Sequence, residues 1–165
     1  MQTYRLTLSA LLVAIGTLTA NLLYIPVGIS KCFPMQHCIN VLCAVLLGPS
    51  YAAAISFLIA LLRNLAGLGS PLAFPGSMIG AICAALVYKR FHTIPAAMAG
   101  EIFGTGILGG YVAYLVATYL LGKATLAFFF IPPFLISTTG GSIIAGLLLK
   151  SGVLNPVKNR LAQSH

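Results

Sequence analysis

The sequence predicts an all-α integral membrane protein built from six transmembrane helices. The chain of 165 residues has a mean hydropathy of +1.03, with 59% hydrophobic and only 6% charged residues. In a soluble domain of this size, roughly a quarter of all residues would be charged. Because one membrane span takes ~20 residues, the length fits a single six-helix membrane domain over residues 1–165 and leaves no room for a nucleotide-binding domain.

Proline and glycine positions separate the six apolar segments. Pro26 ends the first segment, Gly48 and Pro49 separate the second from the third, and Pro95 opens the fifth. In chain order the predicted helices cover residues 6–25, 34–47, 51–65, 76–88, 95–121 and a last stretch, after Gly122 and Lys123, that ends near residue 150. We expect loops at residues 27–33 and 66–75 and a frayed polar tail after residue 150.

The second, third and fourth segments are short for membrane spans. Each has roughly 14 residues, which form ~21 Å of helix. Helices of this length do not cross the hydrocarbon alone. They therefore predict helices that stop part-way at a cavity, where protein or ligand covers the irregular backbone.

The basic residues predict the orientation. With both termini in the cytoplasm, Lys31, Arg63 and Lys123 lie outside and the other six of the nine Lys and Arg lie inside. The inverse topology satisfies the positive-inside rule less well. We therefore expect a multi-pass protein of the cytoplasmic membrane whose N-terminal apolar run is a retained span, not a cleaved signal peptide. The basic residues are scattered singly between apolar segments, which excludes a nucleic-acid-binding patch.

A polar cluster at the start of the second segment predicts a binding site on the outer side. If a helix begins at Pro34, Gln36 and His37 fall on the same helical face as Asn40, four and three residues before it. Lys31 and Phe33 precede this face directly. A polar group left unpaired in hydrocarbon costs several kcal/mol, so the cluster either binds a ligand or bonds neighbouring helices together.

Two further groups fall on the same side of the membrane. Arg63 and Asn64 end the third segment, and Phe74 and Ser77 enter the fourth, where a helix N-terminus favours hydrogen-bond acceptors. The alternatives are a snorkelling arginine and a simple capped loop. Tyr114 is a candidate for the pocket wall or for anchoring at the membrane interface.

The sequence contains no arrangement typical of an enzyme. Neither a Ser–His–acid triad, nor paired carboxylates, nor a metal-ligand spacing is present, so we expect no catalysis and no cofactor. Glu101 is the only acidic residue, and it is expected to pair with Lys89, Arg90 or a partner subunit; the alternative is a proton relay. The four cysteines predict apolar packing; the alternative is a disulfide between Cys32 and Cys38, which lie close to the outer surface in the predicted topology.

Three motifs give the chain its resemblance to a known family. They are Lys31-Cys32-Phe33-Pro34-x-Gln36-His37-x-x-Asn40-Val41, Leu62-Arg63-Asn64, and Ala73-Phe74-Pro75-Gly76-Ser77-Met78-Ile79-Gly80. Over nearly its full length the chain resembles the substrate-binding S components of energy-coupling factor (ECF) vitamin transporters, and within them the ThiW family. The stripe of Ala10 and Ala14 resembles the first-segment motif with which S components dock onto their scaffold subunit.

The resemblance implies a six-helix protein that captures a thiamine precursor, with the thiazole alcohol hydroxyethylthiazole as the expected substrate. It further implies a transmembrane scaffold (T) subunit and two cytoplasmic ATPase subunits as partners, within membrane lipid. Three alternatives stay open. They are an S component for thiamine or hydroxymethylpyrimidine, a stand-alone secondary transporter coupled to an ion through Glu101, and a structural membrane protein whose polar groups only join helices.

Overall fold

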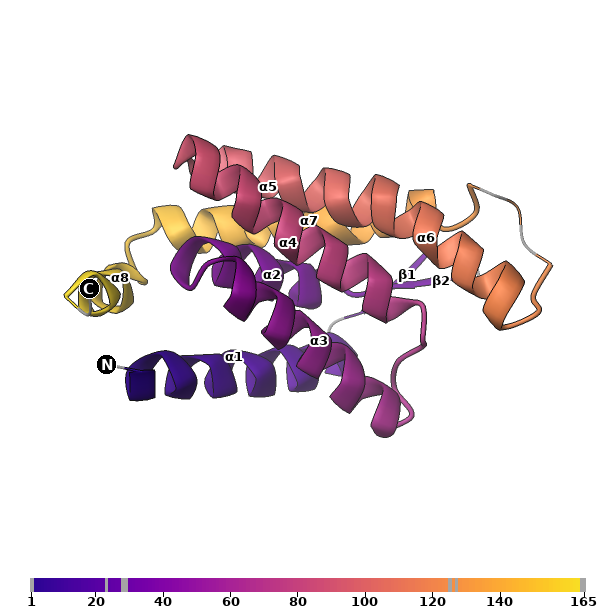
Figure 1. Cartoon of the computed structure of the whole chain (residues 1–165), viewed down its shortest axis with the longest axis horizontal. Helices are drawn as coiled ribbons and strands as arrows, with labels where there is room; N and C mark the ends of the chain where they lie inside the picture. Colours follow the sequence, from indigo (N-terminus) through magenta and orange to yellow (C-terminus); the bar gives the residue numbers. More distant parts are fainter. Residues whose placement is uncertain (1, 23, 28–29, 125, 127, 164–165) are drawn as a thin grey trace.

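The computed structural model describes residues 2–22, 24–27, 30–124, 126 and 128–163, and the side chains of residues 20, 21, 25–27, 30 and 31 are outside that description. Within these ranges the chain is helical apart from one short β-ribbon and its connecting loops. The two ends of the chain lie at one end of the helical bundle, and the β-ribbon lies at the other (Figure 1). A helix is present in each of the six predicted ranges.

The helices differ from the predicted ranges mainly at their ends. The first, α1, is Gln2–Leu22, followed by α2 (Pro34–Leu46), α3 (Pro49–Leu65) and α4 (Ala73–Phe91). The fifth segment is one long helix made of α5 (Ile94–Glu101), the π-helical η1 (Ile102–Gly109), α6 (Gly110–Leu115) and the π-helical η2 (Val116–Leu120). The last long helix, α7, is Ile131–Lys150.

Two expectations about the connections are wrong. Residues 27–33 are not a plain loop, because β1 (Ile25–Val27) and β2 (Ser30–Cys32) pair antiparallel with Pro26 opposite Lys31. The tail after residue 150 is not frayed, because Asn155–Ala162 form a further helix, α8. Pro156 occupies the first turn of α8, where a missing N–H is tolerated, and Leu161 is buried.

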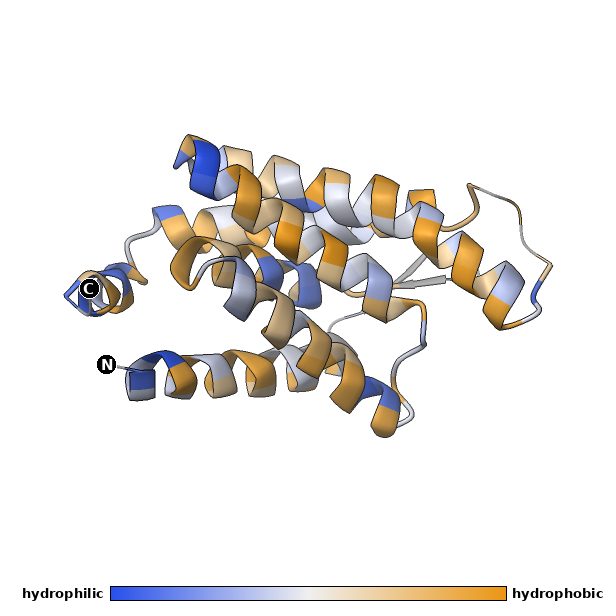
Figure 2. Ribbon diagram, in the orientation of Figure 1, coloured by the Kyte–Doolittle hydropathy of each residue, from blue (hydrophilic) through white to orange (hydrophobic). Residues whose placement is uncertain are grey.

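Helix α2 is the centre of the bundle. It packs against α1, α3, α4, α5 and α7, and all but three of its 13 residues are buried. Its polar residues therefore lie inside the protein, as the hydropathy colouring of the same view shows (Figure 2). A short, central and partly polar helix needs partners on every side, which explains why α2 is not a lipid-facing span.

Glycines allow the helices around α2 to approach closely. A Cβ added at Gly104 would lie 2.9 Å from the Cα of Gly80, and one added at Gly109 would lie 2.6 Å from the Cα of Gly76. These positions join η1 to α4 through backbone contact, as small residues do in membrane helices. As a result, α4 and η1 form a closely packed pair beside α2.

Among the described residues, two helical segments are long and apolar enough to cross a membrane: Ile94–Leu120, with 27 residues, and Ile131–Lys150, with 20. α2 and α3 are shorter apolar helices. The four cysteines are free, so the disulfide considered between Cys32 and Cys38 is not formed. Cys32 instead donates its S–H to the carbonyl of Pro133 on α7, at a sulfur–oxygen distance of 3.2 Å.

Candidate functional site

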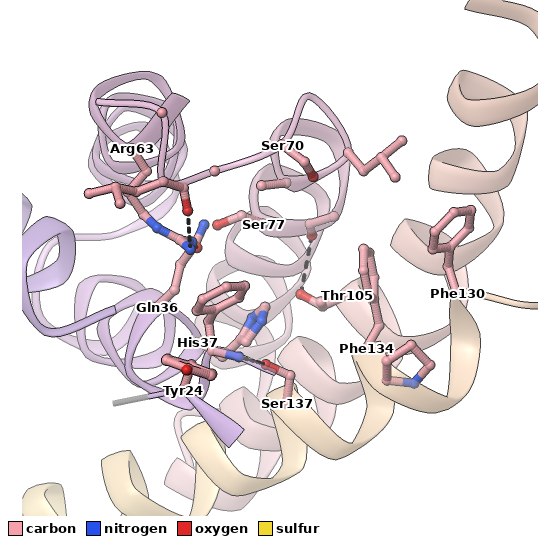
Figure 3. Close-up of a pocket in the computed structure, with 18 residues that line it drawn as sticks. Tyr24, Gln36, His37, Arg63, Ser70, Ser77, Thr105, Phe130, Phe134 and Ser137 are labelled. Atoms are coloured by element: carbon pink, nitrogen blue, oxygen red, sulfur yellow. Dashed lines mark hydrogen bonds between the residues drawn. The ribbon is translucent and has the colours of Figure 1, made fainter. Parts of the chain in front are cut away.

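A cavity of about 550 Å³ lies at the end of the bundle where the β-ribbon is found. Its walls come from α2, α3, α4, η1 and α7 and from the loop between α3 and α4 (Figure 3). This volume is typical of pockets for small molecules. The polar residues that line it are Gln36, His37, Arg63, Ser70, Ser77, Thr105 and Ser137.

Aromatic side chains form one wall of the cavity. Phe130 and Phe134 of the α7 region have ring centroids 6.3 Å apart, and Tyr24 and Phe33 line the cavity from the β-ribbon side. Gly76 on α4 makes room for this wall, because a Cβ there would lie 2.7 Å from a ring carbon of Phe134. The wall can hold a flat ring by stacking or edge contacts.

Glu101 lies behind the cavity and joins three helical segments. Its side chain is 0% exposed. Its Oε1 is 2.9 Å from Nδ1 of His37 and accepts hydrogen bonds from Nδ2 of Asn40 at 3.0 Å and Oγ1 of Thr105 at 2.9 Å. Nδ1 of His37 thus faces Glu101, and His37 also lines the cavity. The expected pairing of Glu101 with Lys89 or Arg90 is therefore wrong.

Asn40 lies beside Glu101 and fixes α4 against α2. Its Nδ2 donates to the backbone carbonyl and to Oγ of Ser77, both at 3.1 Å, as well as to Glu101. Asn40 is buried and does not itself line the cavity, whereas Ser77 does. A single amide thus holds Ser77 in the wall.

Arg63 is turned into the bundle instead of towards the membrane surface, so the snorkelling alternative is wrong. It is 1% exposed although it lines the cavity. Its Nη1 donates to Oε1 of Gln36, and Nη2 donates to the carbonyl of Leu68 at 3.4 Å. The guanidinium carbon also lies 4.1 Å from the ring centroid of Phe33, a cation–π contact.

The structure brings five of the sequence-predicted residues to the cavity wall: Phe33, Gln36, His37, Arg63 and Ser77. Asn64 instead supports the α3–α4 loop, because its Nδ2 donates to the carbonyls of Ala60 at 2.8 Å and Ser70 at 3.1 Å. Phe74 packs against Phe57 and Tyr114 against Tyr111, and neither Phe74 nor Tyr114 lines the cavity. The side chain of Lys31 is outside the described residues.

Several cavity residues were missed by sequence reasoning. Phe134 and Ser137 lie on one face of α7, and Phe130, which directly precedes the helix, continues this face at a spacing of four residues. Thr105 follows Glu101 by four residues and shares its face in the same way. This spacing was readable in the sequence, but nothing in the sequence places either face opposite α2.

The backbone at the mouth of the cavity is held by Ser137. Its Oγ accepts a hydrogen bond from the N–H of Phe33 at 2.8 Å. Because Phe33 stacks on Arg63, this bond fixes both the start of α2 and the position of the guanidinium. The β-ribbon, α2, α3 and α7 thus meet around one cavity.

A sequence model of the ThiW family, described as a thiamine-precursor transporter protein, matches residues 6–153. The chain belongs to the ThiW family. The matched range covers nearly all of α1 and every other helix through α7, and it includes every residue that lines the cavity. No curated protein and no solved structure matches the chain.

Membership of ThiW assigns the chain to a family of transporters, not of enzymes, with a thiamine precursor as the small-molecule substrate. Together with its apolar helices, this identifies a membrane protein. The resemblance noted in the sequence is therefore confirmed at the level of the family.

Proposed function

We propose that this ThiW protein is the substrate-capture (S) component of an ECF-type importer and that it binds hydroxyethylthiazole in the cavity. The observation that carries the proposal is a small-molecule cavity with an aromatic wall and several donors, in a chain whose family transports thiamine precursors. The thiazole ring would lie against Phe130 and Phe134. His37, Gln36 and Arg63 would meet its nitrogen and hydroxyl group.

The charges around the cavity favour this precursor over thiamine itself. Thiamine carries a permanent positive charge, which a carboxylate or an aromatic cage would stabilise. Glu101 is enclosed behind His37 and Thr105, while the cationic Arg63 lines the cavity. A cationic ring would therefore meet repulsion from Arg63 without a directly accessible carboxylate, and only the aromatic wall would offset it.

The proposed topology has six spans with both termini in the cytoplasm. The cavity lies at the end of the bundle opposite the two termini (Figure 1). In this orientation the cavity opens outward, as a protein that captures an external substrate requires. The positive-inside rule supports the same orientation.

Energy for transport would come from partners, namely a transmembrane T subunit and two cytoplasmic ATPases. The proposed docking surface is the stripe of Ala10 and Ala14, both exposed on α1 and flanked by the exposed apolar side chains of Leu11 and Ile15. Small residues let a partner helix approach closely. Reconstituted protein should accumulate substrate only when these partners and ATP are present.

Tryptophan at the docking stripe is expected to prevent assembly. Ala10→Trp and Ala14→Trp place a large side chain where a partner backbone would lie, so co-purification with the T subunit should be lost while ligand binding is kept. Ala99→Trp is the matched control, since Ala99 is exposed on α5, which lies on the opposite side of the bundle from α1 (Figure 1). Equal co-purification of all three variants would contradict the docking surface.

His37→Ala and Asn40→Ala are expected to weaken binding of the thiazole alcohol by about 1–3 kcal/mol each, the effect of leaving buried polar partners unsatisfied. His37 acts at the cavity wall, whereas Asn40 acts by positioning Ser77 and Glu101. Isothermal titration of the purified variants measures the change. Ser56→Ala, on the buried side of α3 and outside the cavity, is the control; unchanged affinity in both site variants would contradict the placement.

One observation favours a second candidate, a stand-alone ion-coupled transporter. Glu101 and His37 form a buried acid–imidazole pair beside the cavity, an arrangement that can carry a proton. Proteoliposomes distinguish the two candidates. Uptake driven by a pH gradient without ATPases and lost in Glu101→Gln would favour the ion-coupled transporter over the S component.

A further inference from the structure

Among the described residues, Arg63 is a buried cation without a carboxylate partner. It is 1% exposed, and its hydrogen bonds run to two neutral oxygens, Oε1 of Gln36 and the carbonyl of Leu68. Among the described residues its Nε has no hydrogen-bond partner. The Phe33 ring, at 4.1 Å, supplies only a cation–π contact. The cost of removing an ion from water is offset only when an opposite charge lies close to it and its hydrogen-bonding groups all have partners.

No carboxylate among the described residues pairs with Arg63. The whole sequence contains one acidic residue, Glu101. Its Oε1 is bonded to His37, Asn40 and Thr105, and its ion pair in the described part of the chain is with His37. Although Oε2 of Glu101 has no hydrogen-bond partner among the described residues, it makes no ion pair with Arg63. A bound ligand is therefore the natural source of a counter-charge for Arg63.

A second unpartnered donor lies next to Arg63. Nε2 of Gln36 is buried and has no hydrogen-bond partner among the described residues, while Oε1 of the same amide accepts from Arg63. Both side chains line the cavity (Figure 3). The unpartnered groups of Arg63 and Gln36 are thus hydrogen-bond donors that lie beside a positive charge. Such donors bind a negatively charged acceptor best.

We propose that Arg63 and Gln36 form a subsite for an oxyanion on the substrate, either a carboxylate or a phosphate monoester, which takes the place of a free hydroxyl. This rests on the proposed function, because the subsite belongs to the same cavity, and it specifies the substrate class further. The guanidinium presents a planar fork that matches two oxygens of such a group. The ring of the same ligand lies on the wall of Phe130 and Phe134.

The test is a titration of the purified full-length protein with three ligands that share one ring. They are hydroxyethylthiazole, its phosphate monoester, and the acid in which a carboxymethyl group replaces the hydroxyethyl group. We expect at least one oxyanion to bind about tenfold or more tightly than the alcohol, because two hydrogen bonds to a charged acceptor replace a hydrogen bond from the guanidinium to a neutral hydroxyl. Which of the two gains affinity identifies the source of the negative charge.

Variants at Arg63 test whether this side chain causes the preference for an oxyanion over the alcohol. Arg63→Gln should reduce the ratio of oxyanion to alcohol affinity to about one, and Arg63→Lys, which keeps the charge without the fork, should retain part of it. The affinity for the neutral alcohol in each variant reports whether the cavity is intact. If a variant does not fold, the ratio in the unmodified protein still decides the proposal.

The same comparison with hydroxymethylpyrimidine and its phosphate monoester separates this proposal from the proposed function. Binding of the pyrimidine pair alone, with the ester tighter, would contradict the thiazole assignment and support the oxyanion subsite. Tight binding of the thiazole alcohol with no gain for either oxyanion would support the proposed function and overturn the subsite. Failure of all these ligands to bind would overturn both.

Discussion

Glu101→Ala is expected to destabilise the folded protein by about 3–5 kcal/mol, because buried hydrogen-bonding groups that lose their partner cost about 1–3 kcal/mol each. The substitution leaves three buried donors on His37, Asn40 and Thr105 without their shared acceptor. These donors belong to α2 and η1, so the cavity should lose its shape together with its stability. Thermal unfolding in detergent and ligand titration measure the two effects.

Two controls separate the charge of Glu101 from its shape. Glu101→Gln keeps one oxygen for His37, Asn40 and Thr105, and its amide nitrogen takes the place of Oε2, which has no hydrogen-bond partner among the described residues. A smaller loss is therefore expected, because the shared acceptor remains. Ser142→Ala removes a buried hydroxyl that has no hydrogen-bond partner in the part of the chain that the structure describes, and it should change little. An unfolding temperature for Glu101→Ala equal to that of the unmodified protein would contradict the assigned network.

Gly141→Ala is expected to destabilise the protein by ~3 kcal/mol, at the upper end of the range for overpacking. A Cβ at Gly141 would collide with the carbonyl oxygen of Pro34 and would lie 2.8 Å from the backbone nitrogen of Cys38. These are backbone atoms of the central helix, which cannot move aside as a flexible side chain can. The helices α2 and α7 would move apart, and the cavity that both helices line would widen.

The neighbouring glycine provides a matched control for this prediction. A Cβ at Gly140 would meet only side-chain carbons of Pro34 at 3.7 Å, an ordinary van der Waals contact. Gly140→Ala should therefore leave the unfolding temperature unchanged or slightly raised, because alanine favours a helix over glycine. Equal effects of the two substitutions, on unfolding and on ligand affinity, would contradict the close packing of α2 on α7.

Much of the fold was predictable because hydropathy and the helix-ending effect of proline and glycine act locally in the chain. Apolar runs bounded by proline and glycine located all six long helical segments, and Pro34 correctly marked the start of α2. The polar face of Gln36, His37 and Asn40 follows from helical spacing alone. The unusual burial of this face could be expected from the scarcity of other polar residues in the chain.

The remaining features depend on contacts between distant parts of the chain. Glu101 is 64 residues from His37, and no local pattern indicates that the two would meet. The β-ribbon was missed because its strands have only three residues each. The helix α8 was missed because its polar composition is typical of a frayed tail, and its burial of Leu161 depends on the rest of the fold.

We propose that the cavity between α2, α3, α4, η1 and α7 holds a thiamine precursor with a thiazole ring. The most direct test is a calorimetric titration of the purified protein with hydroxyethylthiazole, hydroxymethylpyrimidine and thiamine, in the unmodified chain and in His37→Ala. We expect the thiazole alcohol to bind most tightly of these three, and to bind clearly more weakly in the variant. Tighter binding of thiamine or the pyrimidine, or an affinity for the thiazole alcohol that His37→Ala leaves unchanged, would contradict it.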